Sequence, residues 1–172
     1  MFQNYENQST LGLKSDKLCY DVVGFGALVI YESSMYFSQV TREVYEVEHD
    51  GKLPEVEIND VWFALHSMLL TFIVIGQMIY YDGWQQLPTR IALTISGFLV
   101  LLAVLMLFSL QFLQWLYLLS AIKVIITGLK FYPQVMYNYK RKSTQGWSIH
   151  GCIMDLVGSV LSILQLVSCS VH

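Results

Sequence analysis

Ionisable side chains inside apolar stretches are the residues of this sequence best suited to chemistry. Lys123 and Lys130 lie in one such stretch, and Asp155 lies in another. A charged group inside a membrane-spanning helix is costly, so it persists where it pairs, lines a watery cavity or exchanges a proton. The chemistry expected of these residues is reversible protonation and electrostatic binding of a charged solute, with no covalent step.

Asp155 belongs to a polar stripe on the predicted last helix. The members recur at steps of three and four residues, which places them on one helical face. Asp155 could carry a proton next to a bound solute, or it could form a structural ion pair between helices. The stripe consists of Gly151, Asp155, Gly158, Ser162 and Gln165.

The two lysines belong to a second predicted face, on the preceding helix. Lys123, Thr127, Lys130 and Gln134 follow the same three- and four-residue spacing. A lysine near the middle of a span is expected to face the interior of the bundle. Lys130 lies nearer the end of its apolar run, so its side chain could instead extend to the membrane surface.

Pro133 and Gln134 close that apolar run. Proline lacks a backbone donor and clashes with the preceding turn, so a bend is expected at this point. Gln134 could bond the carbonyl groups that the bend releases. The pair is predicted to be either a hinge for alternating access or a helix stop before a loop.

Asp60 opens another apolar run. Asn59 or Asp60 could cap the free N–H groups at the start of this helix, where a carboxylate also complements the helix dipole. His66, further along the same run, is expected to be a packing residue rather than a proton relay.

The composition indicates the elements that must position these residues. Hydrophobic residues make up 55% of the 172 residues and charged residues 13%, about half the share usual in soluble domains. The mean hydropathy is +0.49. Between Arg90 and Lys123 there are 32 uncharged positions, whereas one crossing needs about 20. We therefore expect an all-α membrane protein with two helices there, a turn near Gln111 and Gln114, and five spans in all: 18–37, 61–81, 91–110, 113–132 and 147–167.

Loop charges predict the orientation of these spans. Lys140, Arg141 and Lys142 should face the cytoplasm. Residues 38–60 hold seven acidic and two basic residues, so this loop should face away. The net charge of −3 does not suggest nucleic acid, and the three cysteines lack metal-binding spacing. We expect no metal and no cofactor.

The sequence contains an internal repeat. Residues 4–24 and 138–158, which are 134 positions apart, share eight identities over 21 positions, including Asp21 with Asp155. The matches include polar residues and glycines, which shared apolar composition does not explain. The copies begin four predicted spans apart, so they have the same orientation, as in parallel transporter repeats.

The stretches YPQVMYNY, KSTQGWSI, MDLVGSVLSILQ and INDVWFALH resemble PQ-loop transporters, and within them the cystinosin group. This resemblance implies a seven-helix fold of two parallel three-helix repeats joined by a linker helix. The chain would supply about five of these helices, as a form truncated at both ends that lacks the first helix and the seventh. Residues 1–168 would be a single domain, with a partial first repeat at 1–81, the linker helix at 91–110 and a partial second repeat at 113–168.

The resemblance also implies a function. It predicts a multi-pass protein of the lysosomal or vacuolar membrane that exports L-cystine to the cytosol with protons (H+), which are its coupling ion. Asp155 and Asp60 would couple protons, and Pro133 and Gln134 would form the hinge. The implied substrate-binding residues are Lys123, Lys130, Asn138 and its first-repeat counterpart Asn4.

Two residues depart from the group's pattern, because Gly151 and Asp21 both stand where an asparagine is usual. The solute therefore stays open. The alternatives are a PQ-loop transporter of a cationic amino acid or a sugar, and a non-transporting fragment or receptor-like paralogue.

Overall fold

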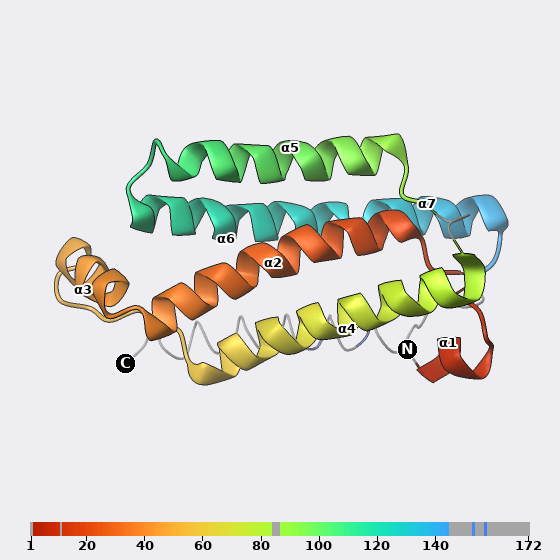
Figure 1. The fold of residues 1–172 in the computed structure, drawn as a ribbon, viewed down its shortest axis with the longest axis horizontal. Helices are drawn as coiled ribbons and strands as arrows, with labels where there is room; N and C mark the ends of the chain where they lie inside the picture. The colour runs from red at the N-terminus through yellow and green to blue at the C-terminus, as the bar shows by residue number, and fades with distance from the viewer. Residues whose placement is uncertain (1, 11, 84–86, 145–152, 154–156, 158–172) are drawn as a thin grey trace.

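A computed structural model of the chain describes residues 2–10, 12–83, 87–144, 153 and 157. All the regular elements assigned in these ranges are helices (Figure 1). They are α1 Phe2–Glu6, α2 Ser15–Phe37, α3 Gln39–Glu48, α4 Ile58–Asp82, α5 Arg90–Leu107, α6 Phe112–Leu129 and α7 Phe131–Arg141.

Four candidate membrane spans confirm the predicted helical membrane fold. Three are the single helices α2, α4 and α5, and the fourth is formed by α6 and α7 together over Phe112–Arg141. They correspond to four of the five predicted spans. The fifth, 147–167, lies largely outside the described residues.

Helix α2 is the centre of the arrangement. It packs on α4 on one side and on α6 on the other, and α5 packs against both α2 and α6 (Figure 1). Met35 of α2 and Leu116 and Ile126 of α6 are almost fully buried in this core. Many apolar side chains of α4 and α5 are exposed, as expected of helices that contact lipid.

Gly24 allows α2 and α6 to approach closely. A Cβ atom at this position would lie 2.9 Å from Cγ2 of Ile126 and 3.6 Å from Cδ of Lys123. A methyl group has no room there, because Cγ2 belongs to a stiff β-branched side chain. The small residue therefore sets the spacing of the two helices beside Lys123.

Helix α2 begins three residues earlier than expected, at Ser15 rather than at residue 18. The predicted start at Leu18 left Lys17 outside the helix. In the structure the Lys17 ammonium lies 2.6 Å from Oδ2 of Asp21, one turn along the same helix. The ion pair offsets the charge, so the helix includes Lys17.

The turn between α5 and α6 is also displaced from its prediction. Helix α5 ends at Leu107 rather than at 110, and Gln114 lies inside α6 rather than in the turn. Nε1 of Trp115 donates to the carbonyl oxygen of Ala103 at 2.8 Å. This bond fixes the two helices against each other near the turn.

The fourth candidate span, Phe112–Arg141, is interrupted near Pro133. Helix α6 ends at Leu129, and α7 runs from Phe131 to Arg141. Proline has no N–H to donate to the carbonyl four residues before it, here Leu129. Pro133 instead occupies the first turn of α7, where N–H groups have no intrahelical partner. The helix-stop interpretation is wrong, because α7 continues for eight residues beyond Pro133, to Arg141.

Residues 38–60, predicted as a loop, contain the helix α3. The amide of Thr41 donates to Oγ of Ser38, which caps this helix at 3.3 Å. Figure 1 shows α3 at the opposite end of the bundle from the end of α7. This placement agrees with the predicted orientation, in which residues 38–60 and the basic residues at the end of α7 face opposite sides of the membrane.

Candidate functional site

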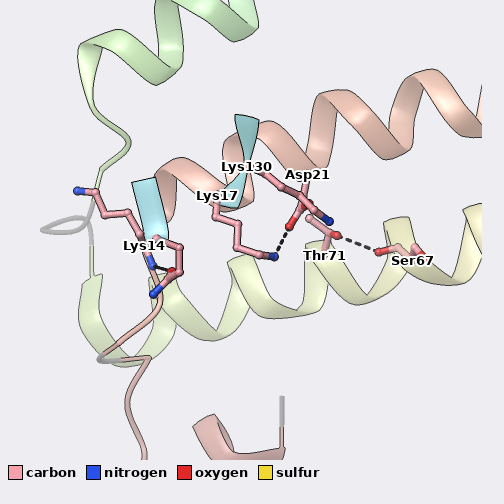
Figure 2. Close-up of polar contacts among 7 residues, drawn as sticks. Lys14, Lys17, Asp21, Ser67, Thr71 and Lys130 are labelled. Atoms are coloured by element: carbon pink, nitrogen blue, oxygen red, sulfur yellow. Dashed lines mark hydrogen bonds and ion pairs between the residues drawn. The ribbon is translucent and has the colours of Figure 1, made fainter. Parts of the chain in front are cut away.

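A buried ion-pair cluster lies between α2 and the junction of α6 and α7. The Asp21 side chain is 5% exposed, and its Oδ2 accepts a hydrogen bond from Lys17 Nζ at 2.6 Å (Figure 2). Its other oxygen, Oδ1, lies 3.4 Å from Nζ of Lys130. The carboxylate therefore pairs with Lys17 of its own helix and with Lys130 at the end of α6.

Lys130 is directed into the protein. Its side chain is 9% exposed, and its ammonium lies 5.6 Å from the ring centroid of Phe25 and 5.1 Å from that of Phe131. The interpretation in which this side chain reaches the membrane surface is wrong. Ion pairing with Asp21 and the two aromatic faces stabilises the charge inside the bundle.

Lys123 lies at the same aromatic ring. Its Nζ is 4.2 Å from the ring centroid of Phe25, and the residue is partly buried. The predicted face of four polar residues holds for Lys123, Lys130 and Gln134 but not for Thr127, which is exposed. The Thr127 hydroxyl donates to the carbonyl of Lys123 at 2.8 Å, so it is satisfied within its own helix.

The charges of this cluster favour anionic ligands. Among its described members, the ammonium groups of Lys17 and Lys130 share one carboxylate, that of Asp21, and the ammonium of Lys123 lies on the same Phe25 ring as that of Lys130. Charge-assisted hydrogen bonds between ammonium and carboxylate groups are stronger than neutral ones. The cluster is thus suited to a solute that carries carboxylate groups.

Gln134 binds the chain segment that precedes α2. Its Nε2 donates to the carbonyl oxygen of Gly12 at 2.7 Å and to Oδ1 of Asn138 at 3.1 Å. Its Oε1 accepts from the backbone N–H of Lys14 at 2.9 Å. The prediction that Gln134 bonds the carbonyls freed by the helix bend is therefore corrected, since its partners are Gly12, Lys14 and Asn138.

The carboxylates of Asp16 and Asp82 accept hydrogen bonds that link neighbouring segments near the start of α2. Asp16 accepts from the N–H and the hydroxyl of Thr89, at 2.6 and 3.0 Å, and so joins α2 to the start of α5. Asp82, at the end of α4, accepts from the hydroxyl of Ser9 and from the N–H and hydroxyl of Thr10. These bonds hold the segment before α2 next to Gln134.

The other predicted residues lie apart from the cluster. Asn4 donates to Oε1 of Gln77 at 3.3 Å, whereas Asn138 contacts Gln134. Oδ2 of Asp60 accepts from the N–H of Glu57 at 2.9 Å in a capping box. Asp60 therefore occupies the capping position expected of it, at the α4 end near α3 (Figure 1). His66, expected to pack, is exposed, and Asp155 lies outside the described residues.

Lys17 is a member of the buried cluster that the sequence did not predict. The signal was present, because Lys17 and Asp21 are four residues apart and therefore lie on one helical face. The structure brings Lys123 and Lys130 together at Phe25 and adds Lys17 and Asp21 to them, whereas Gln134 and Asn138 contact each other on α7. The roles of these residues in transport stay predictions.

Residues 115–168 match the family model described as PQ loop repeat. This match agrees with the PQ-loop resemblance that the motifs in this part of the sequence predicted, and the helical membrane fold fits it.

The chain is similar to cystinosins over nearly its whole length. It is 37% identical over 172 residues to the cystinosin homolog of Caenorhabditis briggsae and 35% identical over 175 residues to the cystinosin of Drosophila melanogaster. It is 31% identical over 168 residues to the cystinosin of Bos taurus. These alignments cover 97%, 97% and 95% of the chain, but 43%, 43% and 46% of the relatives. The chain thus spans less than half the length of these curated relatives.

A more distant relative is named for its solute. The chain is 25% identical over 183 residues to the cystine transporter of Saccharomyces cerevisiae, and it covers 69% of that protein.

Proposed function

We propose that this protein, in its full-length form, transports L-cystine. The observation that carries the proposal is the buried cluster beside Phe25, in which the ammonium groups of Lys17 and Lys130 share the single carboxylate of Asp21. Cystine is a zwitterion with two carboxylate and two ammonium groups. Lys123 and Lys130 would bind its carboxylates, and the similarity to proteins named cystinosin and cystine transporter supports this choice of solute.

Amide groups complete the proposed site. Gln134 and Asn138 bond to each other on α7, the helix that follows Lys130, and Asn4 is the counterpart of Asn138 in the first repeat. Hydrogen-bonding groups of fixed direction orient a small polar solute and exclude those of other shape. Pro133 and Gln134, just after the break between α6 and α7 at Lys130, are the proposed hinge for alternating access between the repeats.

Proton coupling is a further part of the proposal. Asp155 would take a proton from an acidic lysosomal or vacuolar lumen, with Asp60 handling protons on the lumenal side. Neutralising the carboxylate lowers the cost of moving it through the membrane interior, so the repeats could rock and release cystine and the proton into the cytosol. The direction of transport follows the predicted orientation of the loops.

A pair of lysine variants tests the solute site. Lys130→Met removes the buried ammonium, and Lys140→Met makes the same change at an exposed position. Saturable uptake of labelled cystine by proteoliposomes should fall about tenfold or more for Lys130→Met, the equivalent of one lost charge-assisted bond, and stay unchanged for Lys140→Met. Equal uptake by both variants would contradict the proposed site.

Competition identifies the solute class. Unlabelled cystine should inhibit uptake, whereas glucose should not, because it lacks a carboxylate. Lysine and arginine each have one carboxylate and an additional positive charge, and they should compete weakly. Strong inhibition by lysine or arginine alone would instead assign the protein to the transporters of cationic amino acids.

A further inference from the structure

The two oxygens of Asp21 are held in different ways. Oδ2 makes a hydrogen bond to Lys17 at 2.6 Å. Oδ1 lies 3.4 Å from Nζ of Lys130, and it is buried without a hydrogen bond from a described residue. Lys17 is therefore bound directionally, whereas Lys130 is held by charge at a longer distance.

The two lysines also differ in where they belong. Lys17 and Asp21 are one turn apart on α2, so any rigid movement of that helix keeps them together. Lys130 caps the end of α6 in the second repeat. The contact between Asp21 and Lys130 is thus an ion pair between repeats, and it must change when the repeats move relative to each other.

Lys130 needs a negative partner wherever its ammonium is buried. Its side chain is buried, and a buried charge that loses its partner is strongly destabilising. Asp21 does not depend on Lys130 to the same degree, because Lys17 would still offset its charge. Lys130 can therefore leave Asp21 only for another anion.

We infer that Asp21 is a specificity-determining residue that occupies Lys130 in place of a solute carboxylate and is exchanged for that carboxylate when the solute binds. This inference rests on the proposed transport of a carboxylate-bearing solute. Solutes without a carboxylate cannot replace Asp21, so the ion pair between Asp21 and Lys130 remains intact in their presence. Asp21 competes with the solute for the ammonium of Lys130. Lys17 assists the exchange because it still offsets the charge of Asp21 after Lys130 has left.

Two variants in full-length protein test the exchange through the KM for cystine uptake. Asp21→Asn removes the competing carboxylate at nearly constant volume, so the KM should fall about tenfold. Lys17→Met removes the second partner of Asp21, so the carboxylate should hold Lys130 more strongly and the KM should rise. A general loss of structure would not shift the KM in opposite directions.

Asp16→Asn is the matched control. It alters a buried aspartate of the same helix that binds Thr89 and not Lys130, so the KM should stay unchanged even if thermal stability falls. An unchanged or higher KM for Asp21→Asn overturns the inference. If Asp21→Asn does not fold, an unchanged or lower KM for Lys17→Met overturns it. If either result is obtained while the wild-type protein transports cystine, only the inference about Asp21 fails and the proposed function stands. If the wild-type protein transports no cystine, both the inference and the proposed function fail.

Discussion

The side chain of Gln134 donates a hydrogen bond to the carbonyl oxygen of Gly12 at 2.7 Å, across 122 positions of sequence. The same amide accepts from the N–H of Lys14 and donates to Asn138. Gln134 is fully buried, so these bonds satisfy an amide that would otherwise be costly inside the protein. They join the break in the second repeat to the segment that leads into α2.

Replacing Gln134 should therefore weaken this connection between the repeats. Gln134→Leu leaves the N–H of Lys14 and the carbonyl of Gly12 without their side-chain partner. We expect a loss of about 1–3 kcal/mol in the free energy of unfolding, measured by thermal or denaturant unfolding in detergent micelles.

The control is Gln111→Leu. Gln111 is exposed and makes no side-chain cap bond at the start of α6, so this change should alter stability little. Equal effects of the two substitutions would show that the bonds of Gln134 do not stabilise the fold.

Two glycine substitutions should have effects of opposite sign. Gly24→Ala places a methyl group 2.9 Å from Cγ2 of Ile126, and overpacking of this kind costs about 1–3 kcal/mol. Gly97→Ala has open space around its new Cβ, and alanine stabilises a helix by about 0.5–1 kcal/mol relative to glycine. Melting temperatures in detergent should fall for the first variant and rise slightly for the second. Two equal shifts would contradict the close approach of α2 and α6.

Asp60 has two predicted roles, helix capping and proton handling, and two substitutions at this position can separate them. Asn at this position can still accept the bond from the N–H of Glu57, so Asp60→Asn should keep nearly all the stability but lose pH-driven flux. Asp60→Ala also loses the cap, at a cost of about 1 kcal/mol. Transport and melting temperature measured on both variants separate the two roles. Full pH-driven flux in Asp60→Asn would leave Asp60 with the capping role alone.

Much of the fold could be predicted from the sequence because apolar length is a strong signal. The uncharged run between Arg90 and Lys123 required two helices, and the structure has them as α5 and α6. Helix ends were less accurate, because they depend on contacts from elsewhere in the chain. The first turn of α2 contains Asp16 and Lys17, which lower the hydropathy although both side chains are bonded within the fold.

The site was predictable in its residue types but not in its pairings. Spacing placed Lys130 and Gln134 on one face, and the structure buries both. Their partners, Asp21 and Gly12, are more than one hundred positions away in sequence. No local pattern specifies such contacts, because they depend on how the two repeats pack. The exposure of Thr127, on the same predicted face, has the same origin.

The most direct test of the account is pH-driven cystine flux. Full-length protein in proteoliposomes should carry labelled cystine when the side bearing residues 38–57 is acidic, and the flux should fall when the gradient is removed. Asp155→Asn, which carries no titratable carboxyl group, should abolish the gradient-dependent flux while the protein remains folded. Undiminished gradient-driven flux in Asp155→Asn, or no cystine flux in the wild-type protein, would contradict the account.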